Sequence, residues 1–380
     1  MSRSPPGRRA LFLLGSIPLY GLELANIEVA RSLRERGWDV LFLTNEHWGH
    51  QAINPRLDAL GIPHAPAIFF GKMERGAGLR RWLTALRLQL TENLKLWRVL
   101  RRFRPEVIHV GMLEDFIAFL PSLILTRARV VFRAGTDPDA SHRLLRLVWR
   151  AFVFPKVSSL VAVSHFIEGR FLAIGAQASR TRVIYNSVPD RPAGAPLEVP
   201  AANTVRFLYV GQIVRHKGVG ELVRAAIQIF SKRADGELVL LGDTESDFAS
   251  RLRDEVERAG LHDRIRFAGY VSDPRPWFEA SSVHVCPSVT VEAFGIVVVE
   301  AKSAGLPSIV FPSGALPEIV SHELDGYVCS APDSGELVSA MGTYLSDDSR
   351  IRRQGIAARE SLKTLGIDRV DERWLEVFGA

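Results

Sequence analysis

The chain has 380 residues, a hydrophobic content of 47% and a formal net charge of +6. A single hydrophobic core rarely grows beyond about 250–300 residues, so this length predicts two domains. No apolar run reaches the roughly 18 residues that a membrane-spanning helix needs, which excludes such a helix. The two cysteines, Cys286 and Cys329, stand in apolar, strand-like contexts, which predicts core residues of a reducing compartment and excludes a disulfide framework or a cysteine metal site.

Charge is unevenly distributed along the chain. Residues 1–190 contain 27 Lys and Arg against 15 Asp and Glu, and the remainder contains 21 against 27, so the two parts carry net charges of +12 and −6. A basic N-terminal half indicates an anionic partner there, either a membrane surface or an acidic substrate.

The N-terminal segment predicts a βαβ unit. Residues 10–15 are strand-like, 15–21 form a loop, 23–36 have helical periodicity and 38–44 form a second strand, which implies a parallel sheet. Arginines before the apolar run 10–14 allow a short signal peptide, but the helix that follows favours a buried strand. Gly15 and Gly21 are candidate residues of a phosphate- or acceptor-binding loop, with ordinary turns as the alternative.

Residues 79–103 predict a long, basic amphipathic helix. Its expected apolar face is Leu79, Leu83, Leu86, Leu90, Leu94 and Trp97, and arginines crowd the remainder. One interpretation is a helix packed on the sheet with a solvated basic face. The other is a helix that lies on an anionic membrane surface, and both hold if only the arginines meet lipid headgroups.

The rest of the first half ends in a linker. Residues 130–133 predict a strand that ends near Arg133, and Asp137 follows in a loop, where it either faces acceptor hydroxyls or forms a turn. Residues 190–203 are rich in Pro and Ala, so we place the domain boundary there.

The second half opens on a pattern suited to a diphosphate. A strand at 205–210 is followed by Gly211, by Lys217 and Gly218, and by a helix from about 219. An ammonium group beside a helix N-terminus offsets the charge of a bound phosphate. By itself an exposed lysine in such a loop does not indicate a function, so the interpretation depends on the other motifs in the sequence.

The most informative of these motifs lie in residues 287–318. Glu292 and Glu300 stand eight residues apart with Gly295 between them. A buried carboxylate is costly without a partner, so we expect Glu300 to bind an internal group or a ligand. A helix starting near Phe294 would direct free N–H groups at an anion, and eight helical residues rise about 12 Å, the length of a nucleotide-sugar from sugar to ribose.

Several spaced motifs together resemble one enzyme family. The run Pro287-Ser288, Glu292 to Gly295, Glu300-Ala301, Gly305 to Pro307 and Gly314 to Val320 is similar to the E-x7-E region of family-four retaining glycosyltransferases. The resemblance implies an α/β chain with the GT-B fold, two Rossmann-like domains that face each other across a cleft. It implies an acceptor domain at 1–190, a nucleotide-sugar domain at 204–360 and a helix at 361–380 that crosses back to the first domain.

The resemblance also implies roles for individual residues. Lys217 would stabilise the departing diphosphate, Glu292 would bind the sugar hydroxyls and Glu300 the ribose. The further donor-binding residues would be Gly211, Gln212, Arg215, Gly269, Tyr270, Val271, Phe294, Gly295 and Ile296. No metal and no cofactor would be required.

Two positions depart from the family pattern. Arg133 stands where many relatives have a histidine that contacts the donor sugar; we keep it as a catalytic candidate that binds a phosphate or an acidic acceptor instead. Gln212 stands where relatives carry an arginine, so either Lys217 acts with less help or Arg215 substitutes.

The implied activity is transfer of a sugar, most simply from a UDP-sugar, to a hydroxyl of a glycan or lipid-linked glycan. Because 41 of the basic residues are Arg and 7 are Lys, we expect a bacterial source and envelope or extracellular polysaccharide as product. The expected location is cytoplasmic, with peripheral attachment to the inner membrane face through 79–103, and no nucleic-acid partner. The rivals are a sugar-nucleotide epimerase on the same fold and a membrane-associated scaffold with little activity.

Overall fold

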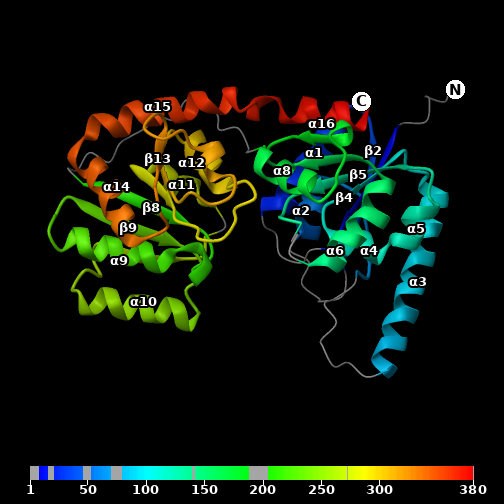
Figure 1. The fold of residues 1–380 in the computed structure, drawn as a ribbon, viewed down its shortest axis with the longest axis horizontal. Helices are drawn as coiled ribbons and strands as arrows, with labels where there is room; N and C mark the ends of the chain where they lie inside the picture. The colour runs from blue at the N-terminus through cyan, green and yellow to red at the C-terminus, as the bar shows by residue number, and fades with distance from the viewer. Residues whose placement is uncertain are drawn as a thin grey trace. The chain divides into compact units, whose positions relative to one another are not determined.

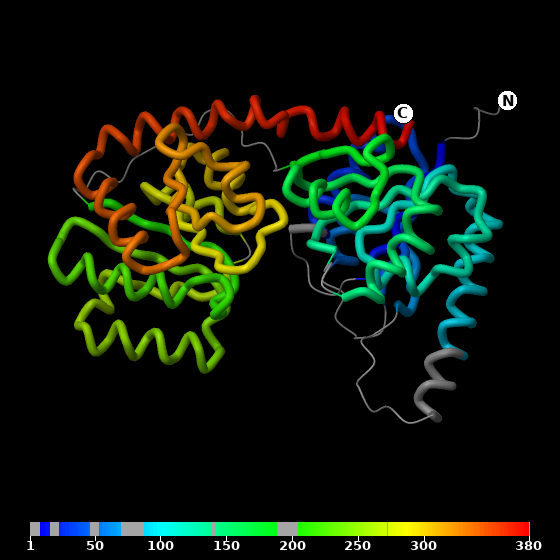
Figure 2. The backbone as a smooth tube through the Cα atoms, in the orientation of Figure 1, coloured from blue at the N-terminus to red at the C-terminus, as the bar shows by residue number. Residues whose placement is uncertain are grey.

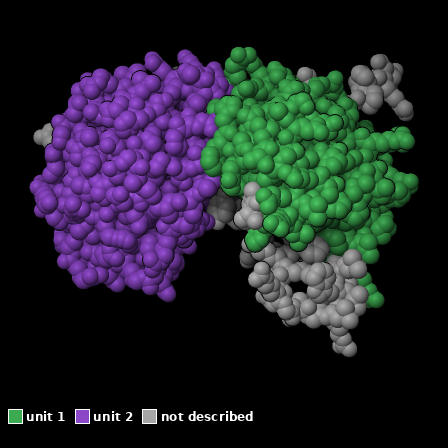
Figure 3. All heavy atoms as spheres, in the orientation of Figure 1, with its two compact units in different colours: residues 1–187, 369–380 green, residues 188–368 purple. Residues whose placement is uncertain are grey.

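The computed structural model describes residues 8–15, 21–45, 53–69, 79–138, 142–187, 204–271 and 273–379. The chain divides into two compact units (Figure 3). Unit 1 comprises 1–187 together with 369–380, and unit 2 comprises 188–368. The segment that returns to the first unit therefore starts at Arg369, whereas the sequence analysis placed its start at 361.

Unit 1 is built on a seven-stranded parallel sheet in the order β3-β2-β1-β4-β5-β6-β7. The strands are β1 (Arg9–Leu14), β2 (Asp39–Asn45), β3 (His64–Ala67), β4 (Val107–Val110), β5 (Arg129–Ala134), β6 (Val157–Ala162) and β7 (Thr181–Val183). Residues 10–14 are buried in β1, which pairs with both β2 and β4. The predicted first strand and the βαβ unit are confirmed.

Helices flank this sheet and the C-terminal helix completes its core (Figure 1). They are α1 (Gly21–Glu35), α2 (Ile53–Ala59), α3 (Leu79–Phe103), α4 (Leu113–Ala118), α5 (Leu120–Leu125), α6 (Arg143–Val148), the π-helical η1 (Trp149–Val153), α7 (Phe154–Lys156), α8 (His165–Ala173), η2 (Ala178–Arg180) and α16 (Val370–Phe378). Phe378 of α16 stacks on Phe12 of β1 with ring centroids 5.9 Å apart. Figure 2 shows this red C-terminal segment beside the blue N-terminal strands.

Unit 2 contains a six-stranded parallel sheet in the order β10-β9-β8-β11-β12-β13. The strands are β8 (Val205–Val210), β9 (Gly236–Leu241), β10 (Ile265–Gly269), β11 (Val283–Cys286), β12 (Ser308–Val310) and β13 (Gly326–Val328). The helical segments are η3 (Arg215–Lys217), α9 (Val219–Phe230), α10 (Asp247–Arg258), α11 (Arg275–Glu279), α12 (Ile296–Ser303), α13 (Leu316–Ile319), α14 (Ser334–Ser346), α15 (Asp348–Thr364) and η4 (Ile367–Arg369). Apolar side chains of α9, α10 and α14 cover one face of the sheet, and those of α11 and α12 cover the other.

The apolar face predicted for the long basic helix is wrong at Leu90 and Leu94. The helix spans Leu79–Phe103 as expected, but Leu90 and Leu94 are 55% and 57% exposed, while Glu92 and Asn93 are buried. The Asn93 amide donates to the Ala118 carbonyl at 2.9 Å and its oxygen accepts from the Ser122 hydroxyl at 2.8 Å. Polar partners on α4 and α5 therefore determine which side faces inward. The side chains of 79–86 lie outside the described residues.

Each sheet has a point at which the strand order reverses. In unit 1 this point lies between β1 and β4, and in unit 2 between β8 and β11. Loops leave the carboxyl ends of two neighbouring strands there in opposite directions, and the crevice between them is where open parallel sheets bind ligands. The topology thus selects one candidate region in each unit before any side chain is considered.

Candidate active site

The switch point of unit 2 brings two predicted catalytic residues together. Lys217 lies in the 3-10 turn after β8, and Glu292 lies in the loop after β11; these strands are parallel neighbours. The Lys217 ammonium Nζ is 2.5 Å from Glu292 Oε1, and the two side chains are 30% and 17% exposed. A cation and a carboxylate that both remain open to a ligand therefore meet at the expected crevice.

Glycines allow the loops around this pair to pack backbone against backbone. Gly218 has φ +69°, and a Cβ there would lie 1.7 Å from the Pro287 carbonyl oxygen. Gly314 has φ +58°, and its Cβ would lie 2.1 Å from the Glu292 carbonyl oxygen, which accepts from the Ala315 N–H at 2.8 Å. The main chain of Glu292 is thus held against Gly314 and Ala315.

Two helices begin beside the pair. Helix α9 begins at Val219, directly after Gly218, and α12 begins at Ile296 after Gly295, whose φ is +88°. Their first N–H groups lack helical partners and suit an anion.

The predicted helix start near Phe294 is about two residues too early, because α12 begins at Ile296, so Glu292 lies in the loop and only Glu300 lies in the helix. The 12 Å estimate therefore does not apply. Glu300 is half-buried, whereas the sequence analysis expected it to be buried.

The other predicted donor-binding residues also follow strands of unit 2. Gly211, Gln212 and Arg215 come after β8, and the residues Gly269 to Val271 come at and after the end of β10. The Gly242 N–H donates to the Gly269 carbonyl at 2.9 Å, and a Cβ on Gly242 would lie 2.1 Å from the Gly211 carbonyl oxygen. These contacts join the loops after β8, β9 and β10 at the carboxyl edge of the sheet.

The predicted donor-binding residues in these loops differ in their contacts and in their exposure to solvent. The Arg215 guanidinium lies over the Phe248 ring at 5.1 Å, and the Tyr209 hydroxyl donates to the Gln212 carbonyl at 2.7 Å. Tyr270 is 80% exposed. Phe294 is buried next to Gly295, so it offers backbone rather than ring to a ligand.

A buried thiol that the sequence analysis did not connect to the site lies behind the ion pair. The pKa of Cys286 is raised to about 12, mainly by burial and also by the negative charge of Glu292, while the charge of Lys217 acts in the opposite direction. The thiol is therefore neutral and is no nucleophile. Cys286 ends β11 directly before Pro287, and this position next to the 287–318 stretch could have placed it near the site from the sequence. Both Cys286 and Cys329 are buried and unpaired, which confirms their prediction as core residues.

The switch point of unit 1 contains Gly15 and an acidic residue that the sequence analysis missed. The Gly15 N–H donates to Asp115 Oδ2 at 3.0 Å, and its carbonyl accepts from the Asn45 amide at 2.9 Å. Asp115 is 3% exposed, and burial raises the pKa of its carboxyl to about 8. Gly21 is the first residue of α1, and the loop between 16 and 20 lies outside the described residues.

Arg133 lies in the interior of unit 1. It is fully buried and donates to Asn26 Oδ1 at 2.7 Å and Asn186 Oδ1 at 2.6 Å. Its guanidinium lies 5.1 Å from the Trp374 ring of α16, and burial lowers its pKa to about 9. This placement argues against the predicted contact with a phosphate or an acceptor and for a role in holding α16.

Asp137 is engaged in an ion pair on the surface of unit 1. Its two carboxylate oxygens accept from Arg170, at 2.9 Å from Nε and 3.2 Å from Nη2. An acceptor hydroxyl would have to compete with this two-point contact.

The residues that the structure describes include neither a metal-binding cluster nor a membrane-spanning helix. No cluster of three or more His, Cys, Asp or Glu in that part of the chain is arranged to hold a metal ion. None of the helices there combines the length and the apolar composition that a bilayer crossing requires.

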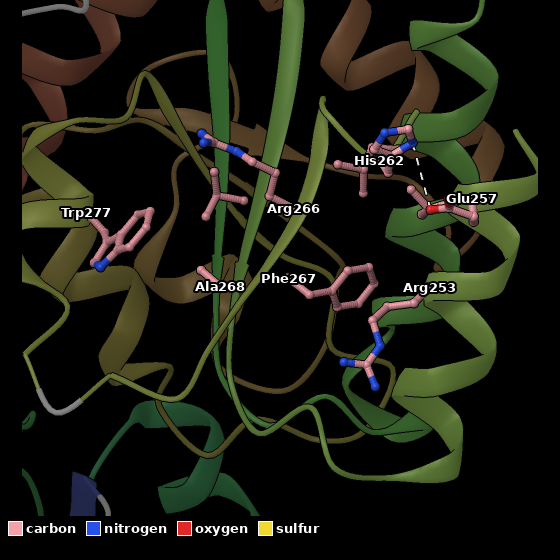
Figure 4. Close-up of a pocket in the computed structure, with 10 residues that line it drawn as sticks. Arg253, Glu257, His262, Arg266, Phe267, Ala268 and Trp277 are labelled. Carbon is pink, nitrogen blue, oxygen red and sulfur yellow. Dashed lines mark ion pairs between the residues drawn. The ribbon is translucent and has the colours of Figure 1, made fainter. Parts of the chain in front are cut away.

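A cavity in unit 2 lies away from the ion pair. It has a volume of about 430 Å³ and borders the edge strand β10, with Arg253, His262, Arg266 and Trp277 among its lining (Figure 4). Neither Lys217 nor Glu292 lines it. We place the reaction at the switch point, because charge and helix N-termini converge there and not at this cavity.

Both halves of the chain match family models of glycosyltransferases. The model of glycosyltransferase family 4 matches residues 20–191, and the model of glycosyl transferases group 1 matches 199–361. The lipopolysaccharide core biosynthesis glycosyltransferase LpsD of Rhizobium meliloti is 27% identical, over 77% of this chain and 81% of its own length. An exopolysaccharide phosphotransferase of Streptomyces coelicolor is 26% identical over 54% of this chain, and the match spans only 21% of that relative.

Solved structures show the same architecture. Anabaena HepE, crystallised with UDP and glucose, superposes with a TM-score of 0.81 at 20% identity, over 98% of this chain and 99% of that one. Two Rossmann-like parallel-sheet units define the GT-B fold. The chain belongs to the family-four, group 1 glycosyltransferases, whose two models together span most of its length.

Proposed function

We propose that the chain is a retaining glycosyltransferase that uses a nucleotide-diphosphate-sugar, most simply a UDP-sugar. The acceptor is a hydroxyl of a glycan or lipid-linked glycan in bacterial envelope or extracellular polysaccharide synthesis. The observation that carries the proposal is the contact between Lys217 and Glu292 at the switch point of unit 2. Neither a metal nor another cofactor enters the proposal.

Lys217 supports departure of the diphosphate. As the bond between the anomeric carbon and the diphosphate oxygen breaks, negative charge grows on that oxygen, and a fixed ammonium stabilises it. The first N–H groups of α9, which begins two residues after Lys217, act in the same direction. The acceptor oxygen bonds to the anomeric carbon on the face that the diphosphate leaves, and the acceptor proton passes to the diphosphate.

Glu292 changes partner when the donor binds. Without a donor its carboxylate neutralises Lys217. A bound diphosphate takes over the ammonium, so Glu292 becomes available to accept hydrogen bonds from sugar hydroxyls. Glu300 on α12 binds the ribose, and the backbone from Gly269 to Val271 holds the base.

The donor and acceptor classes are supported by named relatives. HepE has been crystallised with UDP-glucose, and LpsD is a glycosyltransferase of lipopolysaccharide core biosynthesis. A lipid-linked acceptor would place the enzyme at the inner face of the cytoplasmic membrane. The basic side of α3, with Arg87 and Arg98 next to the exposed Leu90 and Leu94, suits peripheral attachment there.

A donor panel tests the proposal. The purified chain is incubated with UDP-, GDP-, ADP- and dTDP-sugars, with and without a lipid-linked glycan acceptor fraction, and free nucleotide is measured. We expect release from one donor and its loss in Lys217→Ala; the anomeric configuration of the product, read by NMR, should match that of the donor.

The same panel separates the rival functions. An epimerase would change the sugar while the nucleotide stays attached, and a scaffold would release nothing under any condition. Inversion at the anomeric carbon would refute the retaining mechanism alone.

A further inference from the structure

A short helix on unit 1 exposes two leucines. Helix α6, Arg143–Val148, has the sequence RLLRLV, and none of its six residues is buried. Leu144 is 71% exposed and Leu147 58%. Exposing two leucines this fully on adjacent turns is unfavourable in water, so the pair indicates a surface that something covers.

This helix is firmly anchored at its C-terminal end. The backbone stays helical through η1 into α7, with Trp149 and Val153 buried. The Trp149 ring meets Phe132 at 5.1 Å and Phe171 at 4.9 Å. The core contacts of Trp149 therefore fix the direction in which α6 presents its leucines.

The exposed residues of α6 occupy one face. At about 100° per residue, Arg143, Leu147 and Leu144 lie in that order within an arc of roughly 100°. Arg146 borders this arc and is half-exposed. The face therefore combines two aliphatic side chains with two guanidinium groups.

The charge of the segment is wholly positive. Residues 143–156 contain Arg143, Arg146, Arg150 and Lys156 and no acidic residue. Arg150 and Lys156 donate to the carbonyls of Ile174 and Thr126. Among the described residues no ion pair reaches Arg143 or Arg146, so their charges are not neutralised within that part of the chain.

Leucines flanked by unneutralised arginines match the two layers of an anionic membrane surface. Aliphatic side chains enter the acyl region while guanidinium groups stay with the lipid phosphates. We propose that α6 is a membrane-docking helix, inserting Leu144 and Leu147 into an anionic bilayer with Arg143 and Arg146 on its phosphates. A protein partner of this face would instead need acidic groups placed opposite both arginines.

The position of α6 links docking to the proposed reaction. The helix follows β5 at the carboxyl edge of the unit 1 sheet, the edge at which Gly15 and Asp115 lie. Docking through α6 would bring that edge to the bilayer, where the head group of a lipid-linked acceptor is found. This link rests on the proposed function, but the docking itself does not.

Binding of the full chain to lipid vesicles tests whether α6 docks on a membrane. Flotation is measured with vesicles of phosphatidylcholine alone and with vesicles that also contain phosphatidylglycerol, at low and high salt. We expect binding only to the anionic vesicles, weakened by salt. The double variant Leu144→Ser, Leu147→Ser should bind about tenfold more weakly, and Arg143→Gln, Arg146→Gln should lose the preference for anionic lipid.

Matched variants serve as controls, and several outcomes would contradict the proposal. Leu324→Ser, at a residue of unit 2 that is 62% exposed, should bind like the wild type, and thermal unfolding should be unchanged in the leucine variants. Failure of the wild type to float, or equal flotation of the double leucine variant, would overturn the proposal. The proposal would also be overturned if only the double variant Leu90→Ser, Leu94→Ser lost vesicle binding. Self-association of the wild type in solution that the α6 leucine variant abolishes would overturn it as well. Nucleotide release from a soluble donor should be unaffected by the α6 changes, so failure of docking and failure of transferase activity are distinguishable.

Discussion

Lys217 and Glu292 lie 75 residues apart in the chain, yet their charged atoms approach to 2.5 Å. The contact depends on parallel pairing of β8 with β11 and on two glycines that let the loops pack closely. Because each side chain keeps part of its surface exposed, the pair can open for a ligand at a small cost in stability. This availability distinguishes it from the buried pair Lys302 and Asp325, which is closed to ligands.

Removal of either charge should therefore slow transfer strongly while leaving the fold intact. We expect Lys217→Ala and Glu292→Ala each to lower kcat by about 10²–10³-fold, the usual effect of deleting one group that stabilises developing charge. Turnover with the identified donor is the measurement. Lys232→Ala, at an exposed lysine of the same unit, is the control. Near-normal turnover of both site variants would refute the assignment.

A methyl group at Gly314 should disturb Glu292 by sterics alone. The Cβ of Gly314→Ala would lie 2.1 Å from the Glu292 carbonyl oxygen, so the loop that carries the carboxylate must move. We expect a loss of about 10²-fold in kcat/KM, as for other small displacements of reacting groups. Gly260→Ala is the matched control, because Gly260 also has positive φ, at +66°, but has no atom within 4 Å of the new Cβ. Equal effects of the two substitutions would indicate backbone strain and not displacement of Glu292.

The order of strand, loop and helix around the unit 2 candidate site was predictable because its signals are local. Strand, glycine, lysine and helix follow one another within residues 205–219, and a parallel sheet places such loops at one edge whatever else the chain does. The helix containing Glu300 was predicted too early by about two residues, since positive φ at Gly295 delays its start to Ile296.

The unit 1 errors share one cause, which is that polar partners come from distant segments. Asn93 faces inward because Ala118 and Ser122 bind it, and Arg133 is held by residues 107 and 53 positions away. Periodicity assigns a face by hydrophobicity alone, so it could not anticipate a helix that buries an amide and a carboxylate together with Leu96 and Leu100. Asp115 was missed for the same reason, because its partner is the backbone of Gly15.

Asp115 should make the stability of unit 1 depend on pH. Its pKa is about 8 in the folded chain and 3.8 as the ordinary value. Between these values the folded state keeps a proton that the unfolded state has released, so stability falls as pH rises and levels off above about 8. The slope is at most about 1.4 kcal/mol per pH unit, the effect of one proton. Thermal unfolding of wild type and Asp115→Asn across this range measures it, and parallel profiles would show that Asp115 is not the group responsible.

Arg133 offers the sharpest test of a structural against a catalytic role. In Arg133→Met the two oxygens of Asn26 and Asn186 lose their donor in the core, and such orphaned acceptors cost about 1–3 kcal/mol each. The contact with Trp374 is lost as well, so α16 should loosen, and we expect a thermal midpoint lower by several degrees. Below that midpoint, nucleotide release from the donor should stay within about threefold of wild type, because the donor loops belong to unit 2.

The control is Arg182→Met, at an exposed arginine of β7, which should change neither property. If Arg133 instead contacts the acceptor, its variant will keep donor hydrolysis and lose transfer at temperatures where the fold is intact. A change in KM for the acceptor with an unchanged midpoint would therefore restore the role that its sequence position suggested. A lower midpoint with unchanged acceptor KM would establish that the guanidinium serves to hold the C-terminal helix on the first sheet.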